Sequence, residues 1–132
     1  MLKKIDVSTS KRIEFLDITS IVSNIVSESN IKDGICLVYV PHTTCGLTIN
    51  EHADPSVVSD IINHVNKLVP HNSDYKHLEG NSDAHIKASI FGSSLSVIIS
   101  NGKLLLGTWQ GIFLCEFDGP RKRNVYIKIL EG

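Results

Sequence analysis

The chain has 132 residues, of which 42% are hydrophobic and 20% are charged, and its formal net charge is −1. This length predicts one compact domain over residues 1–132, and the composition is that of a globular protein rather than a disordered one. Nucleic-acid-binding proteins usually carry a surplus of positive charge, so the near-neutral balance argues against nucleic acid as a partner.

The cysteines and the hydropathy pattern bear on the compartment. The three cysteines form no CxxC pair, which predicts reduced thiols in a reducing compartment. No stretch approaches the ~20 apolar residues of a membrane span. The lysines near the N-terminus are not followed by the apolar run of a signal peptide. We therefore expect a cytoplasmic protein that does not contact membranes.

The first third of the chain predicts a hairpin, a helix and a buried strand. Apolar residues alternate in 3–8 and in 11–17 on either side of a Ser-Thr-Ser turn, which predicts two strands paired as a hairpin. Asp17 should cap a helix over 18–29, whose apolar residues recur at the spacing of one buried stripe. The run 35–40 is apolar throughout, which is typical of a strand central in a sheet and covered on both faces.

The middle third predicts two helices separated by a long loop. Asp54-Pro55 is the N-cap and first residue of a helix that carries an apolar stripe and stops at Pro70. Residues 71–81 are mostly polar and have no periodicity, so they predict a loop. A short third helix follows over 83–91, with a small apolar stripe.

The last third predicts strands. Asn101-Gly102 is the strongest short signal for a tight hairpin turn. A strand over 107–117 should turn back at 118–120 into a final strand over 124–130, with one face in the core and a mixed second face available for a subunit contact. Strands outnumber helices and mostly follow one another directly. The chain therefore predicts an α+β fold, a largely antiparallel sheet or sandwich with two main helices and one short helix.

Residues capable of chemistry are concentrated in three segments, 41–54, 75–87 and 107–121. Each has an ordinary structural explanation, such as turn hydroxyls, helix caps or solvated charge. Solubility alone does not explain the density of polar residues in the second segment, and a polar loop of that length in a compact domain is more often functional than idle.

The second segment predicts a metal site. His77 and His85 are eight residues apart, one in a loop and one in a helix, and could meet at one ion. Candidate oxygen donors are Glu51, Glu79 and Asp83. Mixed imidazole and carboxylate ligation suits zinc, manganese or iron, whereas an all-carboxylate set would suit magnesium.

Two further features have open readings. Cys45 is close to His42, which permits a Cys/His nucleophile, although a lone thiol in a small protein is more often a packed residue. Arg121-Lys122-Arg123 is the only dense positive charge and suits a phosphate group or an acidic partner.

Three stretches carry a resemblance to a known family. PHTTCGLTINEHADP (41–55), YKHLEGNSDAHIKASIFG (75–92) and NGKLLLGTWQGIFLCEFDGPR (101–121) resemble the YjbQ family, also called the secondary thiamine-phosphate synthase family. The resemblance implies an α+β homotrimer with sites near subunit interfaces, an ability to make thiamine phosphate, and a metal held partly by histidines. The family often has Asn where this chain has His52, so His52 is a less dependable ligand.

Carried across residue by residue, the resemblance implies a set of polar site positions. They are His42, Glu51, Asp54, His77, Glu79, Asn81, Asp83, His85, Lys87, Glu116 and Arg121.

The first functional hypothesis is an enzyme that joins a pyrimidine pyrophosphate to a thiazole phosphate with the help of a divalent metal, zinc or magnesium. Its expected catalytic residues are His42, His85, Glu51 and Asp83. Its expected phosphate-binding residues are Lys87, Arg121 and Asn81. Its expected metal ligands are His77, His85, Glu79 and Glu51.

The second hypothesis is a homotrimer that binds a metal or ligand without turnover, or with a hydrolytic chemistry. It requires only the cluster of histidines and carboxylates. A purely structural protein would leave the polar loop unexplained.

Overall fold

The computed structural model describes residues 1–132 and contains three helices and eight strands. The strands are β1 (Leu2–Ser8), β2 (Glu14–Asp17), β3 (Gly34–Tyr39), β4 (Cys45–Glu51), β5 (Ser94–Ser100), β6 (Lys103–Leu104), β7 (Gln110–Glu116) and β8 (Lys122–Glu131). The helices are α1 (Thr19–Ser29), α2 (Pro55–Leu68) and α3 (Ser82–Phe91). None of the three helices has the length and hydropathy needed to cross a membrane.

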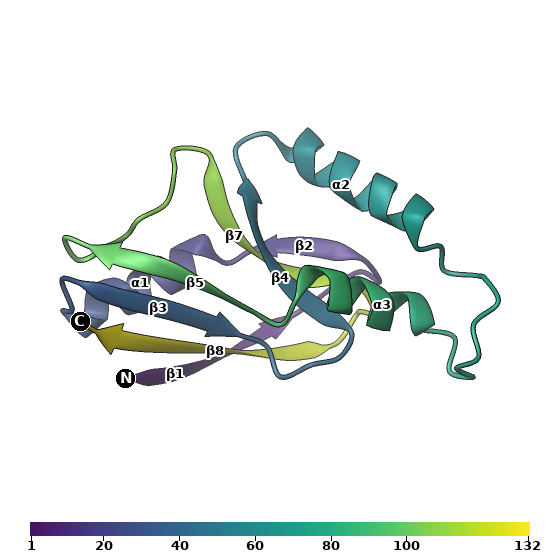
Figure 1. Ribbon diagram of the computed structural model, residues 1–132, viewed down its shortest axis with the longest axis horizontal. Helices are drawn as coiled ribbons and strands as arrows, with labels where there is room; N and C mark the ends of the chain where they lie inside the picture. The colour runs from purple at the N-terminus through teal and green to yellow at the C-terminus, as the bar shows by residue number, and fades with distance from the viewer.

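The strands form two sheets. One has five strands in the order β1-β8-β3-β5-β6, and the other has three in the order β2-β7-β4. Every pairing is antiparallel, so the predicted α+β fold with antiparallel sheets is confirmed. Figure 1 shows α3 lying alongside β4, and both chain ends at one end of the five-stranded sheet.

Helix α1 covers one face of the five-stranded sheet and completes the main core. Its buried residues are Val22, Ile25 and Val26, as the apolar stripe predicts. They pack with buried residues of both sheets in one cluster of 16 residues. Just before the helix, Asp17 accepts a hydrogen bond from the backbone N–H of Thr19 over 2.9 Å. The N-cap itself is Ile18, one residue later than the Asp17 cap that the sequence predicts.

Helix α3 covers the outer face of the three-stranded sheet. Ala84 and Ala88 lie in a second core cluster with Phe113, Cys115 and Phe117. The close packing depends on a glycine in β4. A Cβ atom at Gly46 would lie 2.9 Å from the carbonyl oxygen of Gly92, too close for any side chain. A bare backbone at this point lets the C-terminal end of α3 rest on β4.

Two predicted hairpins are wrong. β1 pairs with β8 and β2 pairs with β7, so the strands predicted over 3–8 and 11–17 lie in different sheets. β7 and β8 also lie in different sheets, although a tight turn joins them. Turn residues indicate only that the chain changes direction. Which strand pairs with which depends on the apolar face that each strand must bury in the core. The Asn101-Gly102 hairpin is present, with φ values of 53° and 76° that suit its tight turn.

Burial of the strands also differs from prediction. β3 is central in its sheet, but its residues alternate between buried and exposed, so it is not covered on both faces. The face of β7 expected at a subunit contact is instead buried, with Ile112 and Leu114 in the main core. Trp109, which lies on the face of the 107–117 strand predicted to be in the core, is 62% exposed. The open apolar face belongs to the five-stranded sheet and includes Leu2, Ile35, Leu37, Tyr39, Ile98 and Leu130.

Helix α2 begins as predicted but packs loosely. Asp54 accepts a hydrogen bond from the backbone N–H of Ser56 over 2.9 Å, and Pro55 is the first helical residue. None of the residues of α2 is buried, and Leu68 is 69% exposed. The predicted apolar stripe is therefore only partly covered.

Candidate functional site

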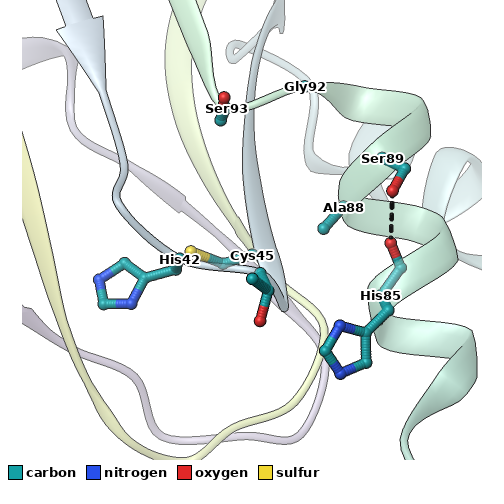
Figure 2. Close-up of a pocket in the computed structure, with 8 residues that line it drawn as sticks. His42, Cys45, His85, Ala88, Ser89, Gly92 and Ser93 are labelled. Atoms are coloured by element: carbon teal, nitrogen blue, oxygen red, sulfur yellow. Dashed lines mark hydrogen bonds between the residues drawn. The ribbon is translucent and has the colours of Figure 1, made fainter. Parts of the chain in front are cut away.

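A polar cavity of about 520 Å³ lies between the loop after β3 and helix α3. Its lining residues are His42, Thr43, Cys45, His85, Ala88, Ser89, Gly92 and Ser93. Figure 2 shows His85 on the α3 wall, with the loop that carries His42 on the opposite wall. The ring of His42 extends away from His85. The first two polar segments of the sequence therefore meet here, because Gly46 allows α3 to lie against β4.

His42 is held by a backbone contact across the fold. Its Nε2 atom lies 2.9 Å from the backbone nitrogen of Asn124, whose N–H donates to it. Burial lowers the pKa of His42 below its ordinary value, and the nearby guanidinium groups of Arg123 and Arg121 lower it further. The ring is therefore uncharged at neutral pH.

The structure brings together the two histidines predicted to share a metal. The rings of His77 and His85 have centroids 5.4 Å apart and planes at 85°. His77 Nε2 also lies 3.7 Å from Glu79 Oε2. No group of three or more His, Cys, Asp or Glu residues in this chain is arranged to hold a metal ion. Within one chain, the arrangement is therefore a histidine pair with a carboxylate beside one ring.

Residues at the far end of β4 do not join this pair. Glu51 is the last residue of β4, six residues beyond Cys45, or about 20 Å along an extended strand. Asp54 caps α2. His52 Nδ1 lies 2.8 Å from Asp17 Oδ2, in a separate hydrogen bond.

Asp83 and Lys87 lie on the core side of α3, with exposed fractions of 0% and 1%. Their side chains are 3.2 Å apart, and Asp83 also accepts hydrogen bonds from Arg12. Lys87 donates to Asn66 of α2 over 2.7 Å. Burial alone would raise the pKa of Asp83, but hydrogen bonds from Arg12 and Lys87 hold it below its ordinary value. Lys87 and Asp83, both predicted to be site residues, are therefore paired with each other and face the interior.

Asn81 and Arg121 share one carboxylate. Asn81 donates to Asp118 Oδ2 over 2.9 Å, and Arg121 Nη2 donates to the same oxygen over 3.0 Å. Arg121 is exposed. The Oδ1 atom of Asn81 is buried and has no partner. Two of the three predicted phosphate-binding residues therefore lie together.

Sequence reasoning placed Glu116 in the site but missed its partners. Glu116 is fully buried, and its carboxylate accepts hydrogen bonds from Arg123, Thr9 and the backbone N–H of Asp118. Arg123 also donates to the hydroxyl and carbonyl oxygens of Thr44. Burial alone would raise the pKa of Glu116, but these hydrogen bonds lower it.

A signal for this network is present in the sequence. Arg123 has the same alternation as Val125, Ile127 and Ile129, all of which face the core. A charge at an inward-facing position of a strand predicts a buried partner.

The Cys/His nucleophile is disfavoured. Cys45 is 1% exposed, and burial raises the pKa of its thiol to about 11. The thiol stays protonated at neutral pH, and a protonated thiol is a poor nucleophile.

Comparison with known proteins decides the family. Residues 3–132 match the family model described as UPF0047 protein YjbQ-like. The chain belongs to the YjbQ/UPF0047 family. It is 59% identical over 130 residues to UPF0047 protein MJ1081 of Methanocaldococcus jannaschii, covering 98% of this chain and 94% of the relative. It is 50% identical to UPF0047 protein YugU of Bacillus subtilis, covering 98% and 99% of the two chains.

Solved structures of the family share the fold. A crystal structure of an uncharacterised YjbQ/UPF0047 protein from Clostridium acetobutylicum has a TM-score of 0.95 at 55% identity, covering 97% of this chain and 99% of the relative. A protein of unknown function from Sulfolobus solfataricus has a TM-score of 0.96 at 38% identity, covering 100% of this chain and 97% of the relative. The names of these relatives state no activity, cofactor or oligomeric state, so membership of the YjbQ family establishes the fold and leaves the reaction to be argued from the site.

Proposed function

We propose that this YjbQ-family chain binds a divalent metal ion at His77 and His85 and a phosphorylated small molecule in the adjoining cavity. The observation that carries the proposal is the position of His85, which contacts His77 on one side and lines the polar cavity on the other. A metal held there would lie at the rim of a space large enough for a small substrate. We place this function in the cytoplasm, where the three free, buried cysteines stay reduced.

The spacing of the histidine pair suits one ion. Two imidazoles bound to one tetrahedral metal at about 2.1 Å have ring centres roughly 5 Å apart, and the observed separation is 5.4 Å. Imidazole ligands favour zinc, manganese or iron over magnesium. Glu79 adds a carboxylate beside His77. The remaining positions would be open to water, to the substrate or to a neighbouring subunit.

The specific reaction that we propose joins a pyrimidine pyrophosphate to a thiazole phosphate, forming thiamine phosphate and releasing pyrophosphate. A bound metal would neutralise charge on the departing pyrophosphate. Arg121 extends from an exposed turn. Asp118 holds its Nε and Nη2 atoms, and its Nη1 atom is available to a phosphate oxygen. The hydroxyl side chains of Thr43 and Ser93 along the cavity supply further hydrogen-bond donors, whereas Ser89 donates its proton to the backbone oxygen of His85.

The test combines metal analysis with a product assay. Purified protein should contain a stoichiometric transition metal. With the two substrates, it should release pyrophosphate and form thiamine phosphate, and a chelator should abolish both products. A protein free of bound metal after reconstitution with zinc and manganese would refute the metal site. Tight metal binding without product would refute the transferase reaction alone.

One observation favours a second candidate, a metal- and ligand-binding protein without turnover. The groups expected to move protons or contact phosphate are engaged within the chain. His42 accepts from Asn124, and Lys87 is paired with Asp83. Binding of metal and inorganic pyrophosphate without any reaction of the substrate pair would support this candidate.

Replacing Arg121 with alanine should weaken pyrophosphate binding by about tenfold while changing stability little. Its bonds run only to Asp118, three residues away, and its side chain is exposed, so folding loses about 0.5 kcal/mol or less. A charge-assisted bond to phosphate is worth more than that. Calorimetric titration and a thermal melt of the same variant check both parts. A lower melting temperature with unchanged affinity would contradict the assignment.

We expect the purified protein to be a homotrimer. The support is the apolar face of the five-stranded sheet, where Ile35, Ile98 and Leu130 are each about half exposed or more. Apolar surface of this kind in a small chain is usually covered by another subunit. Multi-angle light scattering gives the mass directly. A monomer at micromolar concentration would contradict the prediction, and Ile98→Lys should dissociate the trimer without unfolding the chain.

A further inference from the structure

The first residue of β4 has a backbone N–H group that the chain does not pair. In an antiparallel ladder, alternate residues of a strand bond to the neighbouring strand, and the residues between them point to the other edge. Phe117 donates its N–H to the carbonyl oxygen of Thr44 over 3.2 Å, so Cys45, the next residue, points its N–H away from β7. The N–H of Leu47 points the same way and donates to the carbonyl oxygen of Gly92 over 3.1 Å. The N–H of Cys45 has no such acceptor.

This unpaired N–H group lies at the wall of the polar cavity. Cys45 lines the cavity and is 1% exposed, with its side chain in the main core cluster. The edge of β4 to which its N–H points is the edge next to Gly92, another lining residue. A buried N–H without a partner is rare, because it costs free energy comparable to a lost hydrogen bond. The N–H of Cys45 therefore indicates an acceptor that comes from outside the chain.

The hydroxyl group of Thr43 is a second donor on the same wall. Thr43 is exposed, lines the cavity and has no hydrogen-bond partner in the chain. The residues on either side of it are fixed. The ring of His42 accepts from the N–H of Asn124 over 2.9 Å, and Oγ1 of Thr44 accepts from Arg123 over 2.9 Å. A donor held in place by its neighbours loses little conformational freedom when it binds a ligand.

The charge of the cavity favours an uncharged ligand group over an anion. No Lys, Arg, Asp or Glu residue lines it. The last turn of α3, with Ala88 and Ser89, forms the wall across from Cys45 (Figure 2). The C-terminal end of a helix carries partial negative charge. A phosphate group in the cavity would face this end of the helix without a cation beside it, whereas an uncharged ring with an acceptor atom would not be repelled.

We propose that the N–H of Cys45 and the hydroxyl of Thr43 form a donor site that binds the uncharged heterocyclic ring of the ligand through a ring nitrogen or oxygen. This inference rests on the proposed phosphorylated ligand and gives its two parts different places. The ring enters the cavity, and the phosphate groups stay outside it, on the side of His85. His42 and Thr44 act as positioning residues, because they hold the loop that carries the two donors.

The amide of Cys45 reports directly on the site. The probes are the pyrimidine and thiazole alcohols that lack the phosphate groups, and inorganic pyrophosphate. In ¹⁵N-labelled protein as purified, we expect either alcohol at millimolar concentration to shift the amide proton resonance of Cys45. Pyrophosphate should leave it unmoved. The amide of Leu47 is the internal control, since its N–H is already bonded to Gly92.

Two results of this titration would overturn the inference. A Cys45 amide that moves with neither alcohol would show that its N–H is satisfied by water alone. A larger shift with pyrophosphate than with the alcohols would show an anion site in place of a ring site.

The hydroxyl of Thr43 is tested with two matched variants. Thr43→Val removes the donor and keeps the shape of the side chain, whereas Thr43→Ser keeps the donor. We expect affinity for the alcohols to be about tenfold weaker in Thr43→Val and within about threefold of wild type in Thr43→Ser. Melting temperature should not change in either variant, because Thr43 is exposed. Thr108→Val, at an exposed threonine outside the cavity, is the control for the substitution itself.

Equal affinities in Thr43→Val and Thr43→Ser would overturn the role of the hydroxyl. All of these readouts use binding alone and need neither bound metal nor turnover. Absence of metal or product, with the Cys45 shift intact, would refute the proposed function only. Bound metal and product, with an unmoved Cys45 amide, would refute the donor site only.

Discussion

Replacing Arg123 with leucine should lower the free energy of unfolding by about 3–5 kcal/mol, which corresponds to a fall in melting temperature of roughly 10 °C or more. Arg123 is 2% exposed and is paired with Glu116, which is fully buried. Removing the arginine leaves a carboxylate in the interior without its cationic partner, and burying an unpaired charge is among the most costly single changes in a protein.

The same substitution two residues earlier is the control. Arg121→Leu removes an exposed arginine that has only a local partner, so its melting temperature should stay within a few degrees of wild type. The double variant Arg123→Leu with Glu116→Leu removes both charges and should recover part of the lost stability. Thermal melts of the three variants decide the matter. A cost for Arg123→Leu no larger than that for Arg121→Leu would contradict the importance of the network.

The ion pair between Arg123 and Glu116 should also determine how the stability of the protein depends on pH. The folded-state pKa of Glu116 is lowered, so its contribution is present above the ordinary glutamate pKa of about 4.3 and is lost as pH falls through the folded-state value. In Arg123→Leu the unpaired carboxylate is stabilised by protonation, so the deficit relative to wild type should shrink as pH falls. Urea unfolding at neutral and acidic pH measures this change.

Replacing His85 with alanine should remove most of the bound metal and any activity that depends on it. An ion held by His77 and His85 loses one of its few protein ligands, and an incomplete ligand shell binds metal far more weakly. Stability apart from the metal should fall only modestly. His85 lies at the edge of the cavity, outside both core clusters, and the hydrogen bond from Ser89 goes to its backbone oxygen.

His64→Ala is the matched control for metal loss, since His64 is an exposed histidine on α2. Metal stoichiometry should be unchanged in this variant, whereas His77→Ala should behave like His85→Ala. Elemental analysis of all three proteins, prepared in parallel with wild type, gives the answer. Unchanged metal content in His85→Ala would show that its contact with His77 is only packing.

Local features of the fold were predictable because their causes lie within a few residues. Asp54 and Pro55 start α2, and Asn101-Gly102 forms its turn, because capping, a fixed proline φ and positive φ values are properties of short segments. The apolar stripes of α1 and α3 were read correctly for the same reason. The three polar segments predict the family, and the match of residues 3–132 to the family model confirms it.

Strand partners were not predictable from turns. β1 and β2 are close in sequence yet pair with β8 and β7. β3 reads as buried on both faces because periodicity reports hydrophobicity, not which face has a neighbour. Burial of a strand depends on elements that arrive from elsewhere in the chain, such as α1 on one face of the sheet and no helix on the other.

The sequence by itself determined the helices, the tight hairpin and the polar segments in which a site should be sought. Only the tertiary structure decided which polar residues face one another. It turned Asp83 and Lys87 inward, where Asp83 pairs with both Lys87 and Arg12. It also set His42 against a backbone group 82 residues away. Propensity and capping act over one or two turns of chain. These contacts, in contrast, exist only because the two sheets and α3 pack closely enough to exclude water. Each charge left in the interior must then find a partner.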